Sequence, residues 1–178
     1  MKTPDLLRIS AAAAALIVTN MCLITLVGAQ DDPPATDRDR EPNAVITQID
    51  GPADIAADEI RFEAIDIFVD PGDTPLAAYQ FELSSDTAGV EFVGIEGGEH
   101  KAFSEPPFYD PRAMNNSRVI LAAFSTAKDL PKGRSRVARI HVQLEGPGLK
   151  EYRTKLTASA TADGKEIPAT VLIARAGN

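Results

Sequence analysis

The sequence predicts an all-β protein, folded as an antiparallel β-sandwich of the jelly-roll type with about seven to nine strands. Short apolar segments recur at intervals of roughly ten residues and are separated by turn residues. Several of them alternate between apolar and polar residues, as strands with one buried and one solvated face do. The domain shows no convincing helical periodicity.

The strands are expected between clear turn signals. Asp70-Pro71-Gly72-Asp73 combines a fixed proline φ with a glycine, and Asp163-Gly164 is typical of a hairpin turn with positive φ at both central residues. The expected strands are residues 62–69, 76–83, 90–95, 118–124, 137–144, 152–160 and 167–173. Val45 and Ile46 could begin a further edge strand, although Gly51-Pro52 weakens that signal.

Alternation also predicts which side chains face the core. Ile65, Ile67 and Val69 share one face of the first confident strand. The corresponding residues elsewhere are Tyr79, Phe81 and Leu83, then Ala138, Ile140, Val142 and Leu144, then Leu156 and Ala158. Arg139, His141 and Gln143 are expected to face solvent.

Two strands break the simple alternation. The apolar parity changes between Phe92 and Val93, which a β-bulge or a strand buried on both faces would explain. Residues 118–124 are apolar on both parities, which predicts a central strand buried on both sides.

The first 43 residues read as targeting and spacer sequence. Lys2 and Arg8 precede an apolar run, and Val27-Gly28-Ala29 provides the small residues of a cleavage site. We therefore expect a signal peptide at 1–29, a disordered linker at 30–43, and one domain at 44–174. The protein would then be secreted, periplasmic or held in the cell envelope. An uncleaved anchor is the alternative, and only that would place the chain in a membrane.

Charge and cysteine content exclude some function classes. The formal net charge is −8, which argues against a nucleic-acid partner because such proteins usually carry a basic surface. The single cysteine, Cys22, lies in the apolar N-terminal run. Without that run, no disulfide, thiolate metal site or cysteine nucleophile is expected.

Several segments resemble a known family. Residues 65–69 with the Pro71-Gly72 turn, residues 76–86 and residues 90–99 are similar to the opening strands of a cohesin-type domain. Residues 118–125, the turn at 130–133 and the strand that ends at Leu144 resemble its later strands. The resemblance covers about residues 44–174. It implies a jelly-roll sandwich related to carbohydrate-binding modules, and a dockerin-like partner in an extracellular complex.

The long irregular region at 97–117 holds the candidate binding residues, because sites tend to lie on loops that a rigid scaffold positions. The candidates are His100, Tyr109, Asp110, Arg112, Asn115 and Asn116. A plain surface loop explains the same residues. Glu99 beside His100 could do acid–base chemistry, but adjacent residues on an extended segment point apart.

The sequence provides no convincing catalytic or metal site, and no cofactor is expected. His141 faces solvent, with only one other histidine available as a partner. The carboxylates at positions 70, 73, 86 and 96 lack the dense spacing of a calcium loop. A basic cluster at positions 128, 132, 134, 136 and 139 could receive an acidic partner or polysaccharide, or simply protect a strand edge from aggregation.

Three functions follow in order of preference. The first is a non-catalytic, cohesin-like interaction module that binds another secreted or envelope protein through a sheet face or the 97–117 loop. The second is a carbohydrate-binding module in which that loop recognises polysaccharide. Tyr109 and Tyr152 are the rings expected to be exposed, whereas Tyr79 and Phe81 are expected in the core. The third is an enzyme, for which no nucleophile–base pair can be assembled.

Overall fold

The computed structural model describes residues 44–177, so the expected signal peptide (1–29) and linker (30–43) lie outside the described residues. The described chain is a β-sandwich, which confirms the predicted fold class. The strands are β1 (Ala44–Ile49), β2 (Ile60–Asp70), β3 (Ala78–Ser84), β4 (Val90–Gly97), β5 (Arg118–Phe124), β6 (Ser135–Glu145), β7 (Lys150–Ala160) and β8 (Thr170–Arg175). Two 3-10 turns, η1 (Lys101–Phe103) and η2 (Pro111–Ala113), interrupt the long loop. No helix within 44–177 is long and apolar enough to cross a membrane.

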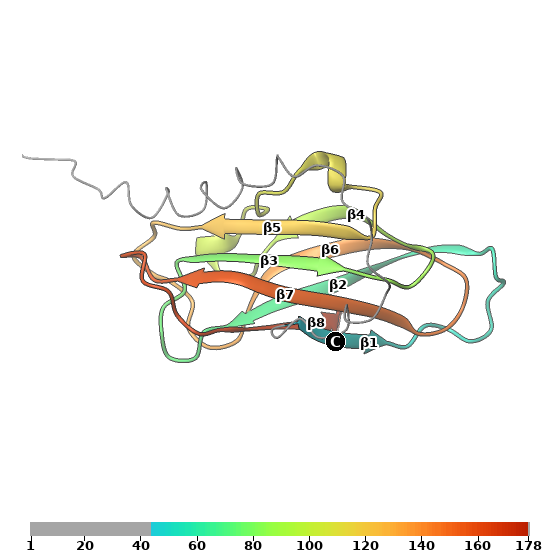
Figure 1. Ribbon diagram of the computed structural model, residues 1–178, viewed down its shortest axis with the longest axis horizontal. Coiled ribbons are helices and arrows are strands. Elements are labelled where there is room, and N and C mark those ends of the chain that lie inside the picture. The colour runs from blue at the N-terminus through green and yellow to red at the C-terminus, as the bar shows by residue number, and fades with distance from the viewer. Residues whose placement is uncertain (1–43, 178) are drawn as a thin grey trace, which may run out of the picture. The chain divides into compact units, whose positions relative to one another are not determined.

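The eight strands form two antiparallel sheets of four. Sheet A has the order β1-β7-β3-β5, and sheet B has the order β4-β6-β2-β8. In Figure 1, β3, β5 and β7 of sheet A lie in front of β2 and β6 of sheet B. The loop with η1 and η2 runs along the side of the sandwich that carries β4 and β5, and β1 and β8 lie on the other side.

The core fills the space between the sheets. Tyr79, Phe81 and Leu83 of β3 are at most 1% exposed, as predicted, and so are Ile65 and Ile67 of β2. The predicted inward residues of β6 are buried as well, and Arg139, His141 and Gln143 face outward. Alternation therefore identified the inner faces of these three strands correctly.

Bulges shift the register in three strand pairs. One lies between Phe92 and Gly94 of β4, so of the two explanations for the parity change, the structure shows the bulge. A second lies opposite the Gln80–Phe81 step, where Thr157 of β7 is the extra residue. Beyond it Ser159 is buried, and Ala158 lies opposite the outward residue Gln80. The prediction that Ala158 faces the core is therefore wrong, whereas Leu156 does pack against it.

The prediction for residues 118–124 is also wrong. This segment is β5, an edge strand of sheet A rather than a central strand buried on both faces. Val119 and Leu121 are buried, but Ile120 is 40% exposed and Phe124 is 58% exposed. The outward apolar residues of β5 lie on the protein surface. The apolar pattern of the sequence alone cannot show whether such residues are exposed or buried.

The turn at Asp163-Gly164 differs from the predicted hairpin. Gly164 has a φ of 82°, but Asp163 does not have positive φ, so the turn type is not the predicted one. The strands on either side, β7 and β8, belong to different sheets. The connection therefore carries the chain from one sheet to the other. The last strand begins at Thr170, later than predicted, with Ile167 buried just before it.

Candidate interaction surface

The loop between β4 and β5 closes one side of the sandwich by pairing with both sheets. Phe108 and Ala122 exchange two backbone hydrogen bonds, of 2.7 and 3.0 Å, which extends sheet A beyond β5. On the other sheet, the amide of Phe92 donates to the Asn116 carbonyl and the Asn115 amide donates to the Phe92 carbonyl. The predicted binding loop is thus held at two places on a rigid scaffold.

Three of the predicted site residues form one local cluster. Arg112 makes a two-pronged hydrogen bond to Asp110, with distances of 3.2 and 3.1 Å. The Asp110 carboxylate also accepts from the Arg112 amide and caps η2. These hydrogen bonds hold the pKa of Asp110 below its usual range. Asn116 donates to the carbonyls of Arg112 and Met114. The cluster satisfies its own charges and hydrogen bonds.

The other predicted residues lie apart from that cluster or support the backbone. Asn115 has a φ of 59°, a left-handed conformation that asparagine tolerates better than most residues. His100 caps η1 by accepting from the Ala102 amide, and its Nε2 lies 3.8 Å from Asp129. Glu99 turns instead to the Arg136 amide, so Glu99 and His100 do not act as a pair.

The two tyrosines expected to be exposed are not free rings. Tyr152 is 1% exposed and lies in the core, so the prediction that it is exposed is wrong. Tyr109 is half-buried and packs against the core. The strand pattern itself indicates the correct face for Tyr152, because Tyr152 shares the parity of Leu156, which is predicted to face inward.

The exposed rings of this side are Phe108 and Phe124. Phe108 is 70% exposed and Phe124 is 58% exposed. Their rings stack with centroids 6.4 Å apart and planes inclined by 13°. The bridge between Phe108 and Ala122 brings the two rings together, because Ala122 and Phe124 share the outward parity of β5.

Small residues lie beside this aromatic pair on the outer face of sheet A. Ala78 of β3 is opposite both Phe124 and Ala160, and Gln80 is opposite both Ala122 and Ala158. These alanines are partly exposed. The aromatic pair therefore stands at the edge of a low apolar floor. We call Phe108, Phe124, Ile120 and these four alanines the aromatic platform.

The polar groups around the platform already have partners. Arg118 donates two hydrogen bonds to Glu82, of 2.8 and 2.6 Å. The Gln80 amide donates to the Thr157 hydroxyl at 3.0 Å. The platform thus presents apolar surface inside a frame of satisfied polar side chains.

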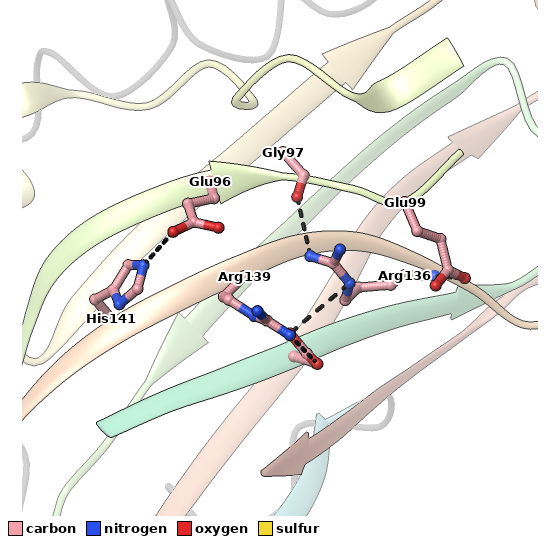
Figure 2. A network of polar contacts seen from close by, with 7 residues as sticks. Glu96, Gly97, Glu99, Arg136, Arg139 and His141 are labelled. Carbon is pink, nitrogen blue, oxygen red and sulfur yellow. Dashed lines mark hydrogen bonds and ion pairs between the residues drawn. The ribbon is translucent and has the colours of Figure 1, made fainter. Parts of the chain in front are cut away.

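The outer face of sheet B carries a different, charged arrangement. Arg139 of β6 makes hydrogen bonds of 2.7 and 2.9 Å to the carboxylate of Asp66 on β2. Arg136 lies 3.8 Å from the same carboxylate and donates to the Gly97 carbonyl. Figure 2 shows His141 and Glu96 pointing toward each other, with their side-chain atoms 2.6 Å apart.

This network engages most of the predicted basic cluster. Arg136 and Arg139 bind Asp66, and Arg134 lies over the ring of Phe68, 4.3 Å from its centroid. The predicted cluster is therefore not one free basic patch. Within residues 44–177, no three histidine, cysteine, aspartate or glutamate side chains lie close enough to hold a metal ion.

No protein-family model, no curated protein and no solved structure matches this chain. The resemblance to cohesin-type domains therefore stays a prediction.

Phe108 and Phe124 were the residues that sequence reasoning missed. The sequence predicts a core position for Phe124, because its strand is apolar on both parities. Phe108 follows Pro106-Pro107 in an irregular segment without periodicity. The signal in the sequence is the large number of apolar residues on both faces of this strand. If such a strand lies at an edge, one of its apolar faces is exposed.

Proposed function

We propose that this protein is an exported, non-catalytic interaction module that binds another secreted or envelope protein through the aromatic platform. The single observation that carries the proposal is the exposed, stacked pair Phe108 and Phe124 on a rigid sheet edge. Exposed aromatic clusters on soluble proteins mark interaction sites, and buried aromatic anchors dominate binding energy at protein interfaces.

The chemistry of the platform favours a protein partner with apolar side chains. Sugar recognition needs free hydrogen-bonding groups beside a stacking ring, but the side chains of Gln80 beside the platform and of Asp110 in the loop already pair with Thr157 and Arg112. An apolar ridge of a partner would bury the two rings without breaking those pairs. A dockerin-like protein is the partner that the resemblance implies.

The test is a capture experiment with a matched control. The full chain, tagged at its C-terminus, is exposed to the host's secreted and envelope proteins. The wild type is compared with the Phe108→Ala/Phe124→Ala double variant. The control is Phe62→Ala, because Phe62 is 69% exposed but lies on the outer face of sheet B. We expect one partner to be retained by wild type and by Phe62→Ala, and lost by the double variant.

Calcium separates the dockerin analogy from other protein partners. Elution by a chelator would support a dockerin-like partner, whereas retention in chelator would keep the interaction module and remove that analogy. Capture that is equal in all three proteins would contradict the role of the platform.

Polysaccharide binding is the second candidate, favoured by the exposed ring of Phe108 in the predicted loop. An aromatic ring can stack on a sugar face as well as on a protein side chain. Retention of the purified chain on polysaccharide, lost in Phe108→Ala, would support it. Protein capture that survives excess free sugar would favour the interaction module instead.

A further inference from the structure

The four edge strands of the sandwich are protected very unequally. The loop at 98–117 pairs with β4 and β5, so these two edges are partly covered. The edge of β1 has no such cover among the described residues, because β1 pairs only with β7. Its sequence, Ala-Val-Ile-Thr-Gln-Ile, contains no charge and no proline. Charges, prolines and bulges are the usual means by which proteins prevent an edge strand from pairing.

The β1 edge is also apolar and exposed. Val45 is 40% exposed and Ile46 is 53% exposed. Beside β1 the surface is hollowed, by about 560 Å³ next to Val45 and by about 490 Å³ next to Thr47 and Ile49. The edge therefore has unpaired backbone and space for further side chains.

We propose that two copies of this chain associate by antiparallel pairing of their β1 strands about a two-fold axis at Thr47. The result is one continuous sheet of eight strands. The pairing covers residues 45–49. It stops at Asp50, because the carbonyl of Asp50 already accepts a hydrogen bond from the Arg175 side chain.

Strand geometry allows this pairing. The Val45 carbonyl faces β7, where it lies 3.5 Å from the Thr154 hydroxyl. Since backbone groups alternate along a strand, those of Ile46 and Gln48 point to the open edge. With Thr47 on the axis, Ile46 lies opposite Gln48 of the second copy and these two residues exchange the hydrogen bonds.

The side chains in this register are complementary. Val45 lies opposite Ile49 of the second copy, and Thr47 lies opposite Thr47 of the second copy. Pairs of β-branched residues are favourable across antiparallel strands. The hollows beside β1 are lined by Val45 at one end of the strand and by Thr47 and Ile49 at the other, together with residues of β8, which leaves space next to this pair.

Charge distinguishes this register from its neighbour only weakly, because the charged groups that differ lie three strand spacings, about 14 Å, apart. Ile46 lies beside Arg153 of β7, and Gln48 lies beside Glu151. With the axis at Thr47, Arg153 of one copy and Glu151 of the other occupy the same row across the sheet. An axis at Ile46 would instead align the two Arg153 residues. Arg153 already lies 3.5 Å from the exposed Asp86 of its own copy.

The two-fold symmetry also determines where the two aromatic platforms lie, and the value of that arrangement rests on the proposed function. A two-fold axis perpendicular to the sheet keeps both outer faces on the same side. The dimer would thus display two aromatic platforms in one direction, one near each end of the eight-stranded sheet. Seven strand spacings put the two β5 strands about 34 Å apart. A partner with two binding sites would bind such a dimer more tightly than the monomer.

The first test measures self-association of the full chain by sedimentation equilibrium. Ile46→Lys places a charge on the open edge, and we expect it to raise the dimer dissociation constant at least tenfold. Ile120→Lys is the matched control, since Ile120 is 40% exposed but lies on β5 at the other end of the sheet. It should leave the dimer unchanged. A wild-type monomer at all concentrations, or self-association that persists in Ile46→Lys, would overturn the proposal.

The second test fixes the register by disulfide formation in a Cys22→Ser background. Thr47→Cys should cross-link two copies on mild oxidation, because residues directly opposite in a non-hydrogen-bonded pair have close Cβ atoms. Ile46→Cys should not, because the two Ile46 positions are then diagonal neighbours. Preferential cross-linking of Ile46→Cys would overturn the register.

These outcomes are separable from those of the proposed function. The Phe108→Ala/Phe124→Ala double variant should lose the partner but still dimerise. Ile46→Lys should keep single-site binding and lose only the gain from two linked sites. A monomeric wild type whose partner is lost in Ile46→Lys would assign the β1 edge to a foreign strand, and would overturn self-pairing.

Discussion

Arg139 on β6 donates two hydrogen bonds, of 2.7 and 2.9 Å, to the carboxylate of Asp66 on β2. The two residues lie directly opposite each other in the pairing of these strands. The Asp66 side chain is only 10% exposed, and Arg136 approaches the same carboxylate. These hydrogen bonds raise the pKa of Arg139. The carboxylate thus joins neighbouring strands of sheet B from a position that is largely shielded from water.

Loss of this carboxylate should be costly. Asp66→Asn removes the charge that faces two guanidinium groups, so we expect the free energy of unfolding to fall by about 2–4 kcal/mol. The control is Glu82→Gln, which breaks a pair with Arg118 whose side chain is 63% exposed. That change should cost less than about 1 kcal/mol. Urea unfolding of the three proteins measures both, and equal losses would contradict the special role of Asp66.

The burial of two tyrosines predicts that the free energy of unfolding falls at alkaline pH. Burial raises the pKa of Tyr152 from 10.0 to about 12, and it raises the pKa of Tyr79 as well. A raised folded-state pKa means that the stabilisation is complete below pH 10. It is lost as pH rises further, because the unfolded phenols ionise first. Each tyrosine should contribute a fall of about 1.4 kcal/mol per pH unit between its two pKa values.

Urea unfolding at pH 8, 10, 11 and 12 tests this expectation. Tyr152→Phe should flatten the decline above pH 10, because a phenylalanine cannot ionise. Tyr79→Phe should flatten it too, but it also removes the hydrogen bond from the Tyr79 hydroxyl to the Val137 carbonyl and so lowers stability at neutral pH by about 1 kcal/mol. If the fall in unfolding free energy above pH 10 is the same in both variants as in the wild type, ionisation of these two tyrosines is not its cause.

The phenylalanines of sheet A should divide into structural and functional residues. Phe81 is fully buried, so Phe81→Ala should cost about 3–5 kcal/mol of unfolding free energy. Phe124→Ala should cost less than about 1.5 kcal/mol, chiefly the stacking with Phe108. Thermal unfolding compares the two. A loss at Phe124 as large as that at Phe81 would mean that the ring is structural and would weaken the case for the platform.

Prediction from sequence worked where polar and apolar residues alternate, as in β6, because alternation identifies the buried face directly. It failed where both faces of a strand are apolar, because the apolar pattern of residues 118–124 fits a central strand and an edge strand equally well. The bulge at Thr157 leaves no mark in the pattern, yet it turns Ala158 outward. The aromatic platform depends on the pairing of Phe108 with Ala122, a tertiary contact that periodicity does not encode.

Gly97 ties the platform loop to sheet B. A Cβ at Gly97 would lie 2.0 Å from the carbonyl oxygen of Ser104, which is backbone and cannot rotate away. Gly97→Ala should therefore displace the start of the loop and lower the unfolding free energy by about 1–3 kcal/mol. Because the same loop carries Phe108, partner capture should weaken as well.

Gly94 is the matched control, since it lies on the same strand. A Cβ at Gly94 would meet only the His141 side chain, at 3.4 Å, which is near ordinary contact. Gly94→Ala should thus keep both stability and partner capture. Urea unfolding and the capture experiment on the two variants separate the outcomes: a stable Gly97→Ala protein that still binds would show that the loop start does not position the platform. Loss of binding in Gly97→Ala beyond what its unfolded fraction explains would show that Phe108 acts only where the loop holds it.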